Sequence, residues 1–227
     1  MTAAADPRVG PGGEAGELAD ALRLEAVRLK AGAFEVGGVS LRVGGGELAT
    51  LSGPVGSGKS TLAAAVAGVI PCGGRVWVGG RDVMGEPPER RAVGWVPQDG
   101  GLLPNLTAGE QIAFPLRVRG VKRAERWRRA AETAEAWGCG GLLSLRQGQL
   151  SGGQARLVSV ARAAAAGPRL MLLDEPLASL DAELRAATVR RLRVWAAETG
   201  GGVLLISHRA GEVKADADFA MPAPNGA

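Results

Sequence analysis

Gly53-Pro54-Val55-Gly56-Ser57-Gly58-Lys59-Ser60, followed by Thr61, is the stretch of this sequence around which the rest can be arranged. Its glycines carry no Cβ, so successive backbone N–H groups can wrap the oxygens of a phosphate. Lys59 adds a mobile positive charge, and the Ser60 hydroxyl adds a ligand for Mg²⁺. A plain glycine turn between a strand and a helix would need neither of these two side chains. The stretch from Gly53 to Thr61 therefore predicts a nucleotide-binding loop.

The segments on either side of this loop alternate between strand and helix patterns. Glu47–Ser52 leads into the loop as a strand, and the alanine-rich Lys59–Gly68 leaves it as a helix. Leu170–Leu173 and Val203–Ser207 are apolar runs that are typical of parallel strands buried on both faces. Four more stretches predict strands, the first two of them antiparallel and half-exposed: Leu22–Leu29, Val39–Val43, Arg75–Val78 and Ala92–Val96.

The chain takes on a helical composition between Thr107 and Ala166. Lys122–Trp137 predicts a charged helix, and Ser151–Ala166 predicts another with Ser151 as its N-cap. A long amphipathic helix is expected over Asp181–Thr199. Strands and helices alternate on both sides of the helical stretch, which indicates a helical unit inserted into an α/β core.

We therefore expect an α/β fold, with a phosphate-loop NTPase core of mostly parallel sheet. An N-terminal antiparallel β subdomain and a helical subdomain at about residues 99–166 would be attached to this core. The 227 residues suit one domain, expected over 20–220. Residues 1–19 are small, acidic and rich in glycine and proline, which predicts disorder and no signal peptide. Residues 221–227 are expected to form a tail.

Composition narrows the class of protein further. The hydrophobic fraction of 46% fits a globular protein, and no stretch reaches the roughly 18 apolar residues of a membrane-spanning helix. At a membrane the chain would have to dock through a partner. The two cysteines, Cys72 and Cys139, fit a reducing compartment without disulfides. The net charge of +4 is mild, so nucleic acid is not an expected partner.

Two adjacent acids, Asp174 and Glu175, follow the apolar run that ends at Leu173. We expect this strand to lie beside the strand that leads into the glycine loop, which would bring both acids to the phosphates. Asp174 would then hold Mg²⁺ through its water shell, and Glu175 would polarise the attacking water as a general base. An ordinary acidic helix cap is the alternative, but it gives no reason for two acids in this place.

His208 is the single histidine of the chain, and it directly follows the predicted strand Val203–Ser207. A lone histidine is more often structural than catalytic. If His208 does take part in catalysis, a pH dependence of activity near neutrality would point to it.

Leu150-Ser151-Gly152-Gly153-Gln154 resembles the signature motif of ATP-binding cassette (ABC) ATPases. Other elements of that family stand around it in the expected order, over roughly Leu22 to Asp218. They are the loop at Gly53–Thr61, Gln98 after an apolar strand, the acids Asp174 and Glu175, the segment Ser179-Leu180-Asp181, and His208. The chain is identified on these motifs as a member of the ABC ATPases.

The resemblance implies a head-to-tail dimer that encloses ATP and Mg²⁺ between two cassettes. Ser151, Gly152 and Gly153 would bind the γ-phosphate of ATP held by the partner, helped by the dipole of the helix that they begin. In such a dimer His208 contacts the γ-phosphate and supports the catalytic glutamate, and Gln98 contacts Mg²⁺ or water at a hinge. The segment from Ser179 to Asp181 would cross the dimer interface. A homodimer is favoured, because both halves of the composite site are present in this chain.

Within the family, Leu102–Glu110 is similar to the segment through which importer cassettes contact their membrane subunits. The resemblance is to cassettes that serve molybdate, thiamine, polyamine or ferric iron uptake. It implies an ATP-hydrolysing subunit on the cytoplasmic face of the cell membrane, with permease subunits and an external substrate-binding protein as partners. An exporter cassette, a non-transport cassette and a regulatory module without turnover remain alternatives.

The sequence departs from the family pattern in three places. The chain has no tyrosine, and Lys30–Ala33 lacks the aromatic residue that usually stacks on adenine, which leaves Phe34 as the candidate. Leu157 stands where an arginine is usual, with Arg156 beside it. After Val213 the family continues through two small strands, whereas here we expect the chain to run into a tail.

Overall fold

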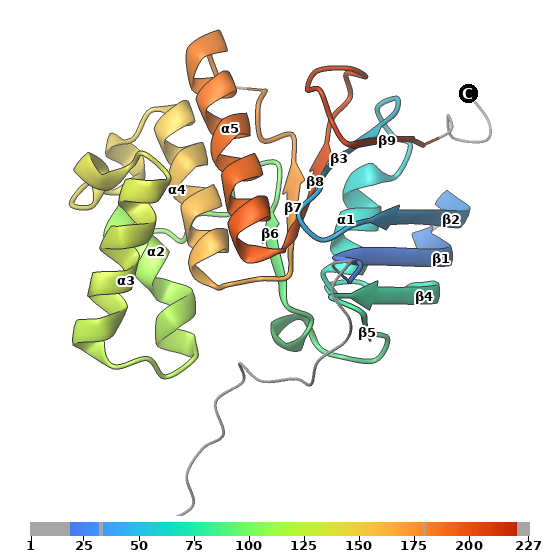
Figure 1. Cartoon of the computed structure of the whole chain (residues 1–227), viewed down its shortest axis with the longest axis horizontal. Coiled ribbons are helices and arrows are strands. Elements are labelled where there is room, and N and C mark those ends of the chain that lie inside the picture. The colour runs from blue at the N-terminus through green and yellow to red at the C-terminus, as the bar shows by residue number, and fades with distance from the viewer. Residues whose placement is uncertain (1–18, 32–33, 179, 222–227) are drawn as a thin grey trace, which may run out of the picture.

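The computed structural model describes residues 19–31, 34–178 and 180–221. The predicted disordered segment, apart from its last residue, lies outside this part of the chain, as do Ser179 and the tail after Met221. Within the described residues, no helix is both long and apolar enough to span a membrane. Figure 1 shows a central sheet with helices on one side and a second sheet on the other.

The central sheet was predicted to be mostly parallel, and all of its strand pairs are parallel. Its strands stand in the order β6-β7-β8-β3-β9, and every residue of β7 and β8 is buried. Apolar runs in these two strands supply both faces of the sheet with core side chains, because successive residues point to opposite faces. The bounds are Val93–Val96 for β6, Leu170–Asp174 for β7, Gly202–Ile206 for β8, Leu48–Ser52 for β3 and Ala217–Ala220 for β9.

One expectation about this sheet is wrong. The strand that carries the two acids, β7, does not lie beside the phosphate-loop strand β3, because β8 is inserted between them. Pairing order cannot be read from apolar runs, since β7 and β8 are equally apolar. The strand that pairs with the loop strand β3 is therefore β8, which ends just before His208.

The end of the chain is also different from the expectation. Instead of running directly into a tail, it adds β9, which pairs in parallel with β3. Two aspartates hold the added segment: Asp216 Oδ2 accepts from the backbone N–H of Leu48 at 2.9 Å, and the Asp218 carboxylate accepts from the Thr50 hydroxyl. Four residues with two exposed side chains form too short a pattern to predict a strand.

The second sheet is antiparallel and has the order β2-β1-β4-β5. The predicted strand at Val39 begins earlier, because β2 continues back through Gly37 and Gly38 to Phe34. Because Gly37 and Gly38 carry no side chain, they interrupt the alternation of apolar and polar residues from which the strand was predicted. The bounds are Phe34–Val43 for β2, Leu22–Ala31 for β1, Gly73–Val78 for β4 and Arg81–Asp82 for β5.

Five helices complete the described part of the chain, with three short 3₁₀ turns at Pro88–Arg90, Gly140–Leu142 and Gln147–Gln149. In Figure 1, α4 and α5 lie along one face of the central sheet, and α2 and α3 stand beyond α4. The helix α1 lies on the opposite side, with the antiparallel sheet. The bounds are Lys59–Val66 for α1, Ala108–Val118 for α2, Arg123–Ala136 for α3, Gly152–Ala165 for α4 and Ala182–Thr199 for α5.

Two hydrophobic clusters hold these layers together. Met171 and Leu173 of β7 belong to the cluster formed with α2, α3, α4 and α5. Leu170 and Leu172 of the same strand belong to the cluster formed with α1 and the antiparallel sheet. Alternate residues of β7 thus pack against both halves of the molecule, and the residues that follow the strand lie where the two halves meet.

Candidate functional site

The glycine loop joins β3 to α1 and wraps around the Lys59 side chain. Lys59 is only 8% exposed, and its Nζ donates to the carbonyl oxygens of Gly53 at 2.7 Å and Pro54 at 2.8 Å. Gly56 and Gly58 have φ values of 81° and 92°, a left-handed conformation that other residues rarely adopt. The loop therefore needs glycine for its own shape and carries a fixed positive charge at its centre.

The first turn of α1 has no side chain that satisfies its N–H groups. Its N-cap is Gly58, which makes no side-chain hydrogen bond, and no acidic residue occupies the first turn. The positive end of the helix dipole thus adds to the charge of Lys59. A helix start of this kind is suited to bind an anion.

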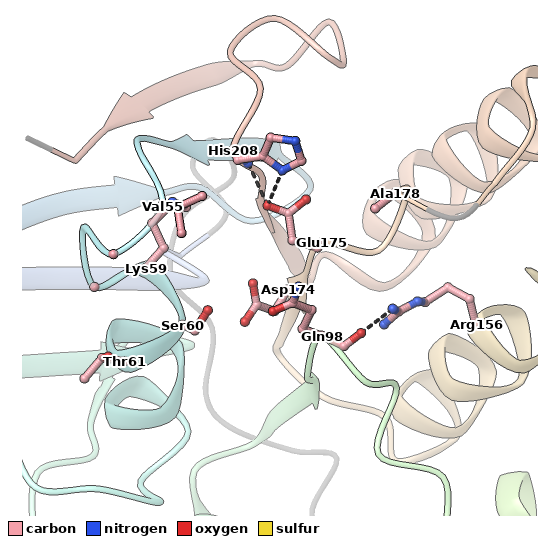
Figure 2. A pocket seen from close by; sticks show the side chains of 12 residues that line it. Val55, Lys59, Ser60, Thr61, Gln98, Arg156, Asp174, Glu175, Ala178 and His208 are labelled. Atoms are coloured by element: carbon pink, nitrogen blue, oxygen red, sulfur yellow. Dashed lines mark hydrogen bonds and ion pairs between the residues drawn. The ribbon is translucent and has the colours of Figure 1, made fainter. Parts of the chain in front are cut away.

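Asp174 ends β7 beside the loop and is 3% exposed. Burial raises the pKa of its carboxyl group, and the neighbouring Glu175 acts in the same direction, whereas Ser60, Lys59 and Arg156 oppose the shift. An ionised carboxylate in this place would be stabilised by a nearby cation. In Figure 2 the Ser60 hydroxyl faces Asp174 across the pocket.

Glu175 and His208 form a pair at the ends of two adjacent strands, β7 and β8. Glu175 Oε1 accepts from the backbone N–H of His208 at 2.7 Å and lies 2.9 Å from His208 Nδ1 (Figure 2). The backbone of Glu175 has a φ of 49°, a left-handed conformation that costs a glutamate about 1–2 kcal/mol. Backbone strain of this kind is concentrated at functional sites, and here it occurs at the residue whose carboxylate contacts His208.

These groups surround one pocket of about 660 Å³. The structure thus brings together predicted residues from the loop, both acids, the hinge candidate and the histidine. Its lining consists of Val55, Gly56, Gly58, Lys59, Ser60, Thr61, Gln98, Arg156, Asp174, Glu175, Ala178 and His208 (Figure 2). Of the remaining loop residues, Ser57 is buried beneath Lys59, and Gly53 and Pro54 bind the lysine through their carbonyl groups.

The signature segment, Leu150–Gln154, does not line this pocket. Its serine is the exposed N-cap of α4: Ser151 Oγ accepts from the Gln154 N–H at 3.2 Å, and Gln154 Oε1 accepts from the Ser151 N–H at 2.9 Å. Of the predicted interface segment, Leu180 is buried, and Asp181 caps α5 by accepting from the Leu184 N–H at 2.8 Å. Ser179 lies outside the described residues.

The two glycines of the signature segment differ in their surroundings. A Cβ added to Gly153 would lie 3.1 Å from Leu184 and 3.3 Å from Leu180, so packing against the chain itself explains this glycine. A Cβ added to Gly152 would meet no atom within 4 Å. Gly152 is exposed and begins α4 without a left-handed backbone. The described part of the chain therefore gives no reason for a glycine at 152.

Sequence reasoning missed Arg156, which it treated only as a departure from the family pattern. The guanidinium group reaches the pocket, where Nη1 donates to the Pro97 carbonyl at 3.0 Å and Nη2 donates to the Gln98 carbonyl. The signal was its position on the helix that the signature segment begins. Among the described residues, no aromatic side chain lines the pocket, and the Phe34 side chain lies outside them.

Comparison with known proteins identifies the family of the chain. A family model described as "ABC transporter" matches residues 36–178. The chain is 39% identical over 176 residues to the molybdate/tungstate import ATP-binding protein WtpC of Thermococcus kodakarensis, covering 77% of this chain and 53% of the relative. It is 42% identical over 197 residues to the Fe(3+) ions import ATP-binding protein FbpC of Streptomyces avermitilis, covering 84% of this chain and 57% of the relative. The chain thus spans about half the length of these curated relatives.

A solved structure shares the fold. The ATP-binding cassette MJ0796, determined as a dimer in a post-hydrolysis state with ADP and Pi, superimposes with a TM-score of 0.72 at 29% identity. The match covers 83% of this chain and 88% of the cassette. The family match extends over more than half of the chain and includes the phosphate loop, the signature segment and both acids. The chain belongs to the ABC transporter family.

Proposed function

We propose that this protein is the ATP-binding and ATP-hydrolysing subunit of a membrane transporter that imports its substrate. One observation carries the hydrolytic part of the proposal: Lys59, Asp174, Glu175 and His208 converge on a single pocket. If these side chains served only to stabilise the fold, a lysine, two acids and a histidine would not be needed together at one edge of the sheet. The dimer of MJ0796 with ADP and Pi supports the same activity.

ATP is proposed to bind with its phosphates in the loop from Gly53 to Thr61. Lys59 and the uncapped start of α1 would neutralise their charge. Mg²⁺ fits the donors beside them, because hydroxyl, amide and carboxylate oxygens are the ligands that it prefers. Ser60 and Gln98 would bind the ion directly and Asp174 through water. The raised pKa of the buried Asp174 supports this placement, since a cation would offset the cost of ionising the carboxyl group there.

Hydrolysis is proposed to depend on Glu175, which would polarise a water molecule for attack on the γ-phosphate. With Oε1 engaged by His208, the second carboxylate oxygen is the one that would contact this water. Lys59, Mg²⁺ and His208 would stabilise the charge that develops in the transition state. Positioning and charge stabilisation account for most of the catalysis in this class of reaction.

A second copy of the cassette would complete the site. Gly152 supports the proposal of a second cassette, because nothing in the described chain explains why this position is a glycine. The absence of a side chain would allow a phosphate bound to the partner cassette to approach closely. The start of α4 would direct its positive end at that phosphate. The interface would also include the segment from Ser179 to Asp181. A homodimer is favoured because one chain carries both halves.

The membrane partners are proposed to be permease subunits, which would hold the cassette at the cytoplasmic face of the cell membrane. A small groove of about 200 Å³ lies beside the Leu102–Glu110 segment, at the start of the proposed helical subdomain, residues 99–166. Its lining mixes aromatic, acidic and basic side chains, among them Phe114, Trp127, Glu110 and Arg117. Such a lining is suited to an amphipathic helix of a partner. An external substrate-binding protein would be the further partner of an importer.

The names of the relatives favour import but differ in the substrate, which is molybdate or tungstate for WtpC and Fe(3+) for FbpC. Substrate choice is therefore assigned to the partners. A pull-down of the tagged chain from its native membranes in mild detergent tests the proposal. Co-purification of a multi-spanning protein and of an external binding protein is expected. Isolation of the chain alone, or with ribosomes or DNA, would contradict the transport function.

A further inference from the structure

We propose that Arg156 is a positioning residue that fixes Gln98 to the signature helix α4, so that the two parts of the ATPase site move together. The inference rests on the proposed function, because it assigns Gln98 to the hydrolytic site. Arg156 itself binds backbone carbonyl groups of the chain. Its effect on catalysis would therefore pass through Gln98.

The contact joins two segments that are far apart in the sequence. Arg156 lies in the second turn of α4, and its guanidinium group donates from Nη1 to the Pro97 carbonyl at 3.0 Å and from Nη2 to the Gln98 carbonyl. Figure 2 shows the side chain extending from α4 toward the Gln98 backbone at the rim of the pocket. A planar guanidinium group can bind two carbonyls at once with fixed geometry, which a lysine cannot do.

A second arginine of α4 extends the same contact. Arg162 donates to the Gly101 carbonyl at 2.7 Å and to the Gly100 carbonyl at 3.2 Å. Between the two arginines, Ser159 packs so closely that a Cβ on Gly100 would lie 2.9 Å from its Oγ. One face of α4 thus binds the carbonyl groups of Pro97, Gln98, Gly100 and Gly101, and a shift of this segment without the helix would break these hydrogen bonds.

The electrostatic surroundings of Arg156 agree with a role in holding these carbonyl groups. No ion pair joins it to a carboxylate among the residues that the structure describes. Burial lowers the pKa of the guanidinium group, while Asp99, Asp174 and Glu175 act against the shift at longer range. An arginine that served only as a surface charge would remain in solvent and would not be placed against carbonyl groups.

The residue next to Arg156 on the helix, Leu157, faces a different way. Consecutive residues of a helix point about 100° apart. Leu157 is 4% exposed and belongs to the cluster that joins α4 to the other helices, whereas Arg156 is turned toward Gln98. Leu157 is thus a core residue, and Arg156 is the residue on the face that meets the Gln98 segment.

The test is a double-mutant cycle on the ATPase activity of the full chain, with Arg156→Ala, Gln98→Ala and the double variant. We expect Arg156→Ala to lower kcat about tenfold with KM for ATP changed less than about twofold. If Arg156 acts through Gln98, the double variant will have the rate of Gln98→Ala alone. Arg156→Lys should recover part of the loss. Arg128→Ala is the matched control, because Arg128 pairs with Glu125 and Glu132 on the exposed face of α3.

Each outcome decides the proposal. An unchanged kcat in Arg156→Ala, or losses that multiply in the double variant, would overturn it. Thermal unfolding shows whether the alanine variant folds, and if it does not, Arg156→Lys takes its place in the cycle with the same two criteria. A wild-type chain without ATPase activity would instead contradict the proposed function, which separates the two failures.

Discussion

Two helices of this protein, α1 and α4, begin at glycine-rich elements but differ in whether a side chain binds the N–H groups of the first turn. At α1 the cap is Gly58, no side chain satisfies the first turn, and Lys59 is enclosed by the loop. At α4 the exposed Ser151 and the half-buried Gln154 satisfy one another in a capping box. The start of α1 lines the pocket, whereas the start of α4 does not.

The difference indicates which half of the site is complete within one chain. The loop at α1 leaves N–H groups for a ligand and is surrounded by the acids and His208. The signature segment is instead folded as a stable helix start without a ligand, with Gly152 open to the outside. On this account the first region acts within its own chain, and the second acts on the nucleotide of a partner.

The largest effects are expected in the region around α1. Glu175→Gln should reduce turnover by at least about 100-fold and leave ATP binding intact, because the glutamine keeps the shape but cannot take up a proton. Lys59→Ala should lose nucleotide binding, since the central charge of the loop is removed. Phosphate release and fluorescent-nucleotide binding measure the two effects. Near-normal turnover of Glu175→Gln, or tight ATP binding by Lys59→Ala, would contradict the assignment.

A substitution at Gly152 tests the second region. Gly152→Glu should fold normally, because an added Cβ meets no atom within 4 Å, yet it should lower ATPase activity about 100-fold by blocking the approach of a phosphate. Nucleotide binding to the isolated chain should persist. Gly141→Glu is the matched control, since Gly141 is exposed and equally open. Equal ATPase activity of the two variants would contradict the proposal that the start of α4 binds the nucleotide of a partner cassette.

The caps of two helices allow a finer comparison. Thr107 and Glu110 form a capping box at α2 like that of Ser151 and Gln154 at α4. Thr107→Ala and Ser151→Ala should each lower the free energy of unfolding by about 1 kcal/mol. Only Ser151→Ala should also lower kcat, by roughly tenfold. Denaturant unfolding and ATPase rates measure both quantities, and equal rates in the two variants would make the Ser151 cap purely structural.

The smallest expected effect concerns the stability of the nucleotide-free protein. Since burial raises the pKa of Asp174, the folded state disfavours its ionised form. Asp174→Asn should therefore raise the melting temperature by on the order of 2 °C at about pH 8. The advantage should shrink as the pH falls through the raised pKa, where the wild-type carboxyl group becomes neutral. Melting curves across this range test the sign, and a lower melting temperature for the variant at about pH 8 would contradict it.

Much of the fold follows from local patterns. The apolar runs predicted β7 and β8, and the start of α4 was predicted from Ser151 as an N-cap. The pairing order was not predictable, because β8 takes its place between β7 and β3 through contacts that equally apolar runs do not distinguish. Similarly, β9 depends on Asp216 and Asp218, which are more than 160 residues from the atoms they bind.

The site shows the same division. Motif residues such as Lys59 and Glu175 could be named from their spacing, and the structure places them in one pocket. The position of Arg156 on the helix of the signature segment was visible in the sequence. Its contact was not, because the carbonyl groups that it binds belong to residues 58 and 59 positions earlier in the chain. The contact of Glu175 with His208 depends on the adjacency of β7 and β8, which the sequence does not specify.

Mixing two inactive variants tests the central claim most directly. Lys59→Ala inactivates the phosphate loop of one chain, and Gly152→Glu inactivates the signature segment of the other. If the two regions act on different nucleotides, the mixed dimer contains one intact composite site, and the mixture should recover up to about a quarter of the wild-type rate. Mixing Lys59→Ala with Asp174→Ala, two changes in the same region, should recover nothing. A Lys59→Ala and Gly152→Glu mixture that is no more active than its separate components would contradict the account.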